Sequence, residues 1–313
     1  MGFLGGGHQL SVCSGTDCDK RGKGFFVIDL TNGNVLWSYT RADNAALDYA
    51  MPAPPTMVDN DLDGFIDRAY IGDLGGNVWR FNFCAASDDI SCTTANWTGA
   101  RLFQRTGTSG PIYAAPAAAK DPKGNVWLYW GTGDRLEPIT VGGGTNSIYA
   151  VKDTGGTVTI GNLENVTGST YADTDEKKGW YLNMTGNGEK VLAEPAIFGG
   201  VAYFTSYIPS TGNDVCQQGQ GTARLYALGY LTATSATGTG TRSIQVGYGI
   251  PTAPIISLKP GGTGTPDLYV TVSSGDYTST RTVKAAVSPP TQSNRANMLF
   301  WRDRRVQTSG SNP

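Results

Sequence analysis

Histidine is nearly absent from this sequence, and its scarcity narrows the enzymatic possibilities. The 313 residues include one histidine, His8, in a glycine-rich stretch with no evident serine, cysteine or carboxylate partner. We interpret His8 as a turn residue, which argues against a hydrolase built on a Ser–His or Cys–His pair. The acidic residues Asp173, Asp175 and Glu176 fall in a polar segment and are interpreted as a solvated loop rather than paired catalytic acids. The glycines at 142–144 lack the strand-glycine-helix context of a phosphate-binding loop.

Long apolar runs and clustered positive charge are also missing. No stretch of eighteen apolar residues occurs, so we expect no membrane insertion by this chain. Residues 1–5 form neither a basic nor an apolar leader, so we expect any export signal and upstream domain to lie outside this sequence. The net charge is −2, the pI is about 5.5, and the basic run at 302–305 is short. We therefore expect no nucleic-acid partner.

Cysteine is sparse and unevenly spaced. The five cysteines form two close pairs, Cys13 with Cys18 and Cys84 with Cys92, and leave Cys216 alone. Close pairs in polar segments favour two local disulfides made in an oxidising compartment, although four cysteines allow three connectivities. Neither pair has the two-residue spacing of a zinc knuckle, which argues against a four-cysteine zinc site. Cys216 is either a free thiol or pairs with a cysteine outside this sequence or in another chain.

Glycine, by contrast, is abundant, and short elements recur between the glycine-rich turns. The chain has 43 glycines and only 16% charged residues, which is typical of an all-β fold. Five aromatic segments align with one another, centred on Phe26, Trp79, Tyr149, Tyr226 and Phe300. Proline-led segments precede four of them, at 53–55, 115–117, 194–196 and 253–255. A third element lies between these two, around Tyr70, Tyr129, Tyr203 and Tyr269.

Several short strands per repeat, separated by glycine turns, are typical of propeller blades. We predict an all-β fold, an irregular or truncated β-propeller of about five to seven four-stranded blades, forming one domain over residues 1–313. The repeats are longer than the roughly 40 to 50 residues of common blades, so we expect loop insertions, at 157–190 and 229–249. An array of β-sandwiches is the alternative, but its modules would be about 100 residues long. The run Asp29-x-x-x-Gly33-x-x-x-Trp37 is similar to the tryptophan docking motif of quinoprotein propellers, and we expect it to pack between blades.

An acidic stretch at 59–67 is the best candidate for a site. Its carboxylates stand at positions 1, 3, 5 and 9 with Gly64 at position 6, as at the front of an EF-hand loop. The predicted ligands are the side chains of Asp59, Asp61, Asp63 and Asp67 and the carbonyl of Phe65. An EF-hand would place glutamate at position 12, where this chain has Tyr70, and the flanks are predicted strands, so the loop is strand-borne. An oxygen-rich flexible loop suits Ca²⁺ better than Mg²⁺; the alternative is an acidic turn that binds no ion.

The same stretch carries a family resemblance. Asp-x-Asp-x-Asp-Gly-x-x-Asp at 59–67, followed by Tyr-x-Gly-Asp-x-x-Gly-Asn-x-Trp-Arg-Phe at 70–81, resembles the calcium-binding blade of the C-terminal propeller in PilY-type proteins. The glycines at 5–7 and the segment 29–37 fit the same family, whereas nothing resembles its N-terminal von Willebrand A-like part. The calcium-binding blade would span residues 51–83.

The resemblance implies a surface protein rather than an enzyme. PilY-type proteins are type IV pilus tip-associated adhesins and biogenesis factors, in which calcium controls retraction. The expected partners are minor pilins or the pilus tip complex, together with a host or abiotic surface, and the expected location is extracellular, at the pilus tip or outer membrane. One alternative is a quinoprotein-like, PQQ-dependent dehydrogenase, which the lack of adjacent cysteines argues against. Another is a purely structural module of an envelope or filament complex.

Overall fold

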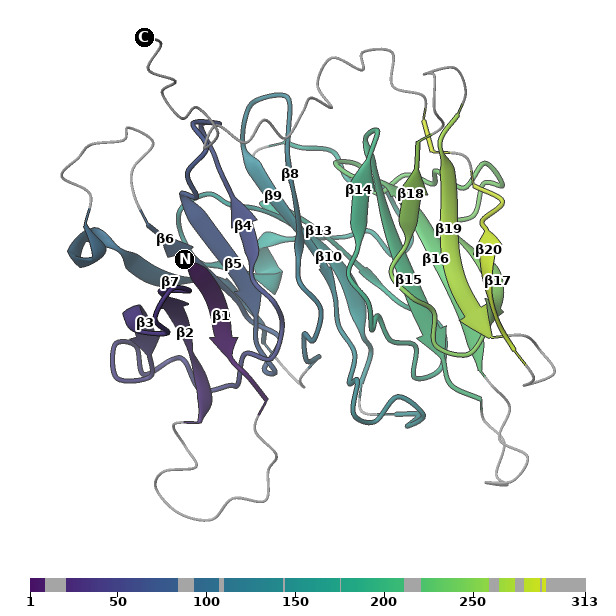
Figure 1. Ribbon diagram of the computed structural model, residues 1–313. Helices are drawn as coiled ribbons and strands as arrows, with labels where there is room; N and C mark the ends of the chain where they lie inside the picture. The colour runs from purple at the N-terminus through teal and green to yellow at the C-terminus, as the bar shows by residue number, and fades with distance from the viewer. Residues whose placement is uncertain are drawn as a thin grey trace, which may run out of the picture.

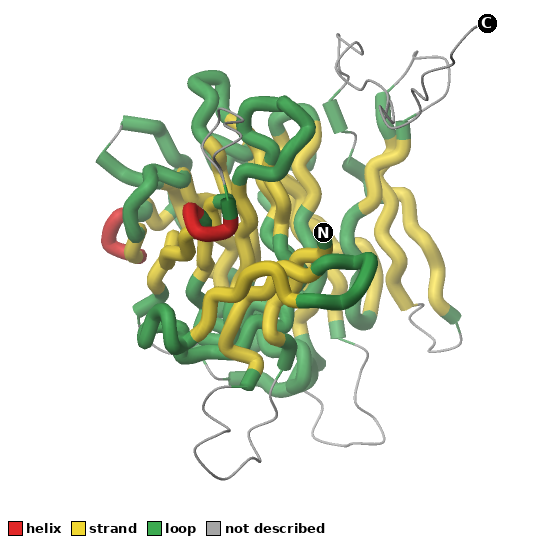
Figure 2. The backbone as a smooth tube through the Cα atoms, turned by 60° about the vertical axis from the view of Figure 1, so that its left-hand side comes forward, coloured by secondary structure: helices red, strands yellow, loops and turns green. Residues whose placement is uncertain are grey.

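The chain folds into a series of small β-sheets that follow one another across the molecule (Figure 1). The computed structural model describes residues 1–8, 21–83, 93–106, 110–142, 144–174, 176–210, 221–258, 265–273, 279–287 and 289–290. Within these ranges the regular structure consists of strands and two single helical turns, η1 (Thr94–Asn96) and η2 (Ile160–Asn162), drawn red in Figure 2.

Five structural units can be distinguished by their hairpins. Unit 1 contains β1 (Gly2–Gly6), β2 (Gly22–Ile28) and β3 (Val35–Thr40). Unit 2 contains β4 (Thr56–Val58), β5 (Arg68–Gly72), β6 (Val78–Asn82) and β7 (Thr98–Gln104). Unit 3 contains β8 (Ala117–Lys120), β9 (Val126–Gly131), β10 (Ser147–Lys152) and β13 (Gly179–Asn183). Unit 4 contains β14 (Ala196–Phe198), β15 (Val201–Ile208), β16 (Thr222–Gly229) and β17 (Ser243–Tyr248), and unit 5 contains β18 (Ile255–Ser257), β19 (Asp267–Ser273) and β20 (Thr280–Lys284). One residue pair between β17 and β19, Tyr248 with Ser273, joins units 4 and 5 into a seven-stranded sheet.

The hydrophobic core lies between neighbouring units rather than inside any one of them. Four clusters of buried side chains join units 1 and 2, 2 and 3, 3 and 4, and 4 and 5. The strands β9 and β10 are buried along their whole length because their sheet is covered on both faces. The four Pro-led strands β4, β8, β14 and β18 form the inner edges of their sheets and lie next to one another in that order. This stacking of sheets is the arrangement of propeller blades.

Glycine permits the close approach of neighbouring units at two equivalent positions. A Cβ atom on Gly72, at the end of β5, would lie 2.3 Å from Ile112 of the segment leading into unit 3. A Cβ atom on Gly131, at the end of β9, would likewise lie 2.3 Å from Val191 of the segment leading into unit 4. Such distances are far shorter than any van der Waals contact, so a side chain at either position would push the units apart.

One segment of unit 3 crosses onto unit 2. After β10 the chain forms β11 (Val158–Thr159), which pairs in parallel with β7 at the outer edge of unit 2. It then passes through η2 and β12 (Glu164–Asn165) before β13 completes unit 3. Units 2 and 3 are therefore tied at their outer edge by main-chain hydrogen bonds as well as by side-chain packing.

The structure confirms the predicted all-β propeller class and most of the repeat. The Pro-led segments precede the first strands β4, β8, β14 and β18, and the tyrosine element lies in the second strands β5, β9, β15 and β19. Phe26, Trp79, Tyr149 and Tyr226 lie in β2, β6, β10 and β16, which are equivalent strands. Phe300 falls outside the described residues, and in unit 5 the strand following β19 is β20, which has no aromatic residue. The hairpin topology of the units differs from the long modules of a sandwich array.

Two details of the predicted fold require correction. The segments 157–190 and 229–249 were expected to be loop insertions, but each contains the fourth strand of its unit, β13 or β17. Units 1 and 5 show three strands rather than four within the described residues. The missed strands follow polar turns rich in threonine and glycine, whose composition conceals the strand signal.

Trp37 packs as the sequence predicted. The centroid of its ring lies 6.4 Å from that of Phe25, 6.1 Å from that of Phe81 and 5.8 Å from that of Trp97, in the cluster between units 1 and 2. The Asp29 carboxylate accepts hydrogen bonds from the Thr31 amide at 2.9 Å and the Asn32 side chain at 2.9 Å, and so shapes the turn before β3. This motif is structural. The five cysteines lie outside the described residues, so the two disulfides stay predictions.

Candidate metal centre

The acidic loop connects the first two strands of unit 2, β4 and β5. Its last residue, Asp67, is anchored in the sheet, because its amide donates to the Val58 carbonyl at 3.0 Å and its carbonyl accepts from the Phe83 amide at 2.9 Å. Asp67 is also the buried member of the loop, with 6% of its surface exposed. The loop therefore consists of an exposed acidic turn that ends at a buried carboxylate, whose main chain is bonded into the sheet.

Three of the predicted ligands come together. Asp59, Asp61 and Asp67 each offer one carboxylate oxygen, and these oxygens lie within 4.8 Å of one another. Calcium binds oxygen at about 2.3–2.6 Å, so two ligands of one ion can be as much as about 5 Å apart. The three carboxylates therefore fit a single Ca²⁺ shell without a large rearrangement.

The other two predicted ligands are placed differently. The Asp63 carboxylate is not part of the group of three, and its Oδ1 atom accepts a hydrogen bond from the Phe65 amide at 2.7 Å. The Phe65 side chain is 66% exposed, as expected if only its carbonyl is used. Ligation by Asp63 and by the Phe65 carbonyl stays a prediction.

The loop's own amides hold its carboxylates in place. Asp59 accepts hydrogen bonds from the Leu62 amide at 2.6 Å and the Gly64 amide at 2.9 Å, and Asp67 accepts from the Asn60 amide at 2.5 Å. Leu62 and Gly64 both have positive φ angles, of 68° and 98°. This left-handed backbone is what glycine at position 6 makes possible, and it wraps the chain around the carboxylates.

The electrostatics of the loop favour a cation. Desolvation raises the pKa of Asp61, and repulsion from Asp63, Asp67 and Asp59 acts in the same direction. One cation reaches the loop from unit 3, where the Lys120 ammonium group donates to the Asn60 carbonyl. A surface groove of about 300 Å³ between β4 and β8 is lined by Asp59 and Lys120 among others. The candidate centre thus lies at the seam between units 2 and 3.

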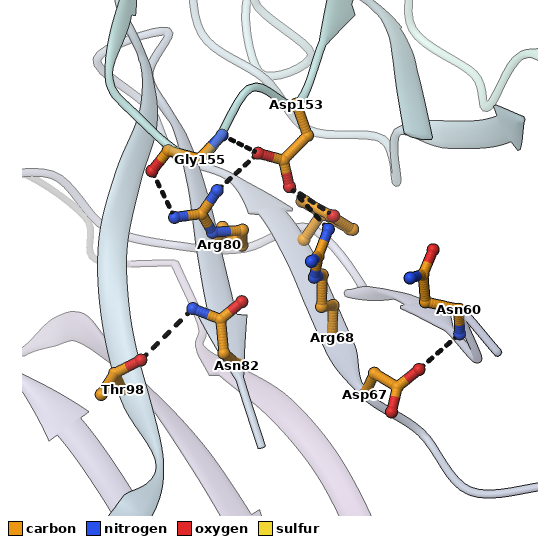
Figure 3. Close-up of polar contacts among 9 residues, drawn as sticks. Asn60, Asp67, Arg68, Arg80, Asn82, Thr98, Asp153 and Gly155 are labelled. Carbon is orange, nitrogen blue, oxygen red and sulfur yellow. Dashed lines mark hydrogen bonds and ion pairs between the residues drawn. The ribbon is translucent and has the colours of Figure 1, made fainter. Parts of the chain in front are cut away.

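The cation nearest in sequence does not pair with the loop. Arg68 follows Asp67 directly, but its Nη1 atom lies 3.3 Å from Oδ2 of Asp153, which belongs to unit 3 (Figure 3). Sequence analysis missed Asp153 and its partners Arg68, Tyr70 and Arg80. A signal did exist, because Tyr70 belongs to the tyrosine repeat and Asp153 directly follows the aromatic strand of the next repeat.

The residues weighed for catalysis have structural surroundings. The His8 ring stacks on Tyr113, with ring centroids 6.1 Å apart. Asp173 was expected to be solvated, but its carboxylate pairs with Lys152, with Nζ and Oδ2 2.8 Å apart. Asp175 falls outside the described residues. Within the described part of the chain, the grouped carboxylates of the acidic loop are the cluster best suited to bind a ligand.

Sheets stacked as blades around Pro-led inner strands, with a carboxylate-rich loop on one blade, define a β-propeller domain with a candidate metal centre. Residues 3–177 match the model of the PilY1 beta-propeller domain. The chain therefore belongs to the PilY1 propeller family, as the motif in unit 2 predicted.

Individual relatives agree with this assignment. The chain is 24% identical over 250 residues to a type IV pilus biogenesis factor PilY1 homolog of Xylella fastidiosa, a match that covers 68% of this chain and 17% of the relative. It is 26% identical over 253 residues to the type IV pilus biogenesis factor PilY1 of Pseudomonas aeruginosa strain PAO1, covering 62% of this chain and 21% of the relative. The chain thus spans about a fifth of the length of these relatives.

A solved structure supports the fold. The crystal structure of the Pseudomonas aeruginosa PilY1 C-terminal domain superposes with a TM-score of 0.60 and 18% identity, over 80% of this chain and 65% of that domain. Among the described residues, no helix is long and apolar enough to cross a bilayer.

Proposed function

We propose that this chain is a calcium-binding surface propeller of a type IV pilus biogenesis factor. In this proposal it acts in pilus biogenesis and adhesion, and calcium occupancy of the acidic loop controls retraction. The observation that carries the proposal is the convergence of Asp59, Asp61 and Asp67 on one shell in a PilY1-family propeller. Its partners would be pilus-associated proteins and a host or abiotic surface, and its location would be extracellular.

Calcium selectivity follows from the loop. Ca²⁺ accepts six to eight oxygen ligands in a flexible shell, whereas Mg²⁺ demands a tight octahedron and gives up its water reluctantly. The half-buried Asp59 and the exposed Asp61, beside one buried carboxylate, can adapt to the larger ion. We therefore expect isothermal titration calorimetry of the purified chain to detect Ca²⁺ binding with a Kd below about 1 mM, and Mg²⁺ binding at least about tenfold weaker. Tighter binding of Mg²⁺ than of Ca²⁺ would contradict this assignment.

The cellular role can be tested separately from ion binding. In cells whose pili depend on the full-length protein, Asp59→Ala should change twitching motility or surface attachment while the protein is still exported and pili still assemble. The expectation follows because the loop lies on one blade and the hydrophobic seams between units do not depend on it. The variant Asp29→Ala, in an exposed acidic turn of unit 1, is the matched control. Wild-type motility and attachment in the Asp59→Ala cells would refute the regulatory role even if calcium binding is lost.

A further inference from the structure

A contact recurs at the seams between units. In units 1 to 3, the strand that precedes the repeat's aromatic strand (β1, β5 or β9) carries an aromatic residue of its own. This residue contacts the residue that follows the aromatic strand of the next unit (β6, β10 or β16). Phe3 of unit 1 lies 5.1 Å from Phe83 of unit 2, and Tyr129 of unit 3 lies 6.4 Å from Tyr230 of unit 4, measured between ring centroids. At the seam between units 2 and 3, Tyr70 meets a charged residue, Asp153.

Asp153 is the centre of a buried polar cluster (Figure 3). Its side chain is 1% exposed. Oδ1 accepts from Arg80 Nη1 at 2.5 Å and from the Gly155 amide at 2.9 Å, and Oδ2 accepts from the Tyr70 hydroxyl at 2.8 Å and from Arg68 at 3.3 Å. Arg80 also donates to the Gly155 carbonyl at 2.7 Å. One carboxylate of unit 3 therefore holds two guanidinium groups of unit 2.

Arg68 links this cluster to the metal loop. It is the residue after Asp67, and its guanidinium group lies in the field of both the Asp153 and the Asp67 carboxylates. Successive residues of a strand point to opposite sides, which lets Arg68 reach across the seam while the Asp67 carboxylate turns back to the Asn60 amide. If Asp153 lost its charge, the guanidinium group would be released beside the carboxylate that anchors the metal loop.

Unit 3 also contacts the opposite end of the loop. The Lys120 ammonium group on β8 donates to the Asn60 carbonyl, and the Thr56 hydroxyl on β4 donates to the Pro116 carbonyl. The loop between β4 and β5 is thus bounded at both ends by contacts with unit 3. Its geometry depends on how the two units dock.

We propose that Asp153 is a positioning residue for the metal loop. By holding the Arg68 guanidinium group at the seam, it keeps a competing cation away from Asp67, so that metal binding in unit 2 requires the docking of unit 3. This inference rests on the calcium site proposed above. It couples the docking of unit 3 on unit 2 to ion binding in the loop. Because such coupling is reciprocal, docking strengthens ion binding and the bound ion stabilises docking to the same extent.

Calorimetry with Ca²⁺ on four forms of the chain tests this role: unaltered, Asp153→Asn, Arg68→Gln and the double variant. Asp153→Asn should weaken Ca²⁺ binding by about three- to fivefold, the upper part of the range expected when a partly exposed ion pair forms at a ligand. Arg68→Gln alone should bind Ca²⁺ at least as tightly as the unaltered chain, because it removes a nearby positive charge. The double variant should regain the affinity of the unaltered chain to within about 1.5-fold. A merely structural role for Asp153 would not be rescued by removing Arg68.

A second measurement needs no variant. Saturating Ca²⁺ should slow amide hydrogen exchange in residues 153–159, where the Asp153 amide donates to the Val126 carbonyl. The matched segment 230–235, which follows β16 in unit 4, should show a smaller change. Absence of Ca²⁺ binding by the unaltered chain would refute the proposed calcium function. If the unaltered chain binds Ca²⁺, three outcomes would refute the positioning role alone. These are equal binding by Asp153→Asn, failure of the double variant to recover its affinity, and unchanged hydrogen exchange at 153–159.

Discussion

Replacing Asp73 by alanine is expected to destabilise the chain by about 3 to 5 kcal/mol, since several buried donors would lose their acceptor at once. The Asp73 carboxylate, in the turn between β5 and β6, is fully buried. It accepts hydrogen bonds from the Gly75 amide, the Asn77 amide and the Trp79 indole Nε1, each at 2.9 Å, and from the Asn77 side chain at 2.9 and 3.1 Å. Each donor that becomes unpaired in the core costs about 1 to 3 kcal/mol.

Thermal unfolding monitored by circular dichroism provides the measurement, with Asp29→Ala as the matched control. Asp29 accepts bonds from the Thr31 amide, the Thr31 hydroxyl and the Asn32 side chain in a similar turn, but its donors are exposed to water. Water replaces the lost acceptor there, so the fall in Tm should be much smaller. Equal falls in Tm for the two variants would show that burial of the Asp73 network does not stabilise the fold.

The order of the blades could be predicted from the sequence because each unit repeats the same physical requirements. A proline is tolerated at the start of a strand with one unpaired edge, as in β4 and β8, and an aromatic side chain fills the seam to the next sheet. These requirements recur in each unit, so Tyr70, Tyr129 and Tyr203 could be aligned without knowledge of their contacts.

The turn motif that includes an aspartate and a tryptophan shows where such alignment fails. Asp29 stands between β2 and β3, Asp73 between β5 and β6, and Asp121 between β8 and β9, so the motif occupies three different hairpins. Asp121 accepts from the Trp127 indole at 3.1 Å, as Asp73 does from Trp79. At Asp73 and Asp121 the motif specifies a tight turn bonded to a buried indole, whereas Trp37 packs in the seam without an indole bond to Asp29, so the motif does not specify a position in the blade. Local hydrogen bonds determine the turn, and they are available in any hairpin.

The candidate metal centre could be predicted only as far as its loop. Spacing of the carboxylates identified Asp59, Asp61 and Asp67, whose oxygens do converge, but it could not separate them from Asp63. The seam residue Asp153 is far from the loop in sequence and comes next to it only because units 2 and 3 stack. Long-range contacts of this kind have no periodic signal in a single sequence.

Calcium should stabilise the folded chain, and Asp67→Ala should abolish the effect. An ion that binds only the folded form adds about 2.7 kcal/mol to the free energy of unfolding at a hundredfold excess over its Kd. Asp67 carries the buried carboxylate of the group, and main-chain bonds to Val58 and Phe83 fix its position in the sheet. Replacing it by alanine removes the buried part of the ligand shell. In the absence of calcium the same substitution removes one of four close negative charges, but it also removes the acceptor of the Asn60 amide. The metal-free variant should therefore lose only about 1 kcal/mol of stability.

The comparison that isolates the ion is the difference in Tm between excess Ca²⁺ and chelator, measured for the unaltered chain, Asp67→Ala and Asp63→Ala. We expect a clear rise in Tm with Ca²⁺ for the unaltered chain and none for Asp67→Ala. Asp63→Ala should lose less of the rise than Asp67→Ala, because the exposed Asp63 carboxylate accepts from the Phe65 amide and lies outside the three grouped oxygens, which makes it a peripheral ligand of the predicted set. If the ion instead requires all four carboxylates, Asp63→Ala will lose the rise as completely as Asp67→Ala, and the shell must contract on binding. An unaltered chain whose Tm is the same in Ca²⁺ and in chelator would identify the loop as an acidic turn, and calcium control of retraction would then have no structural basis in this blade.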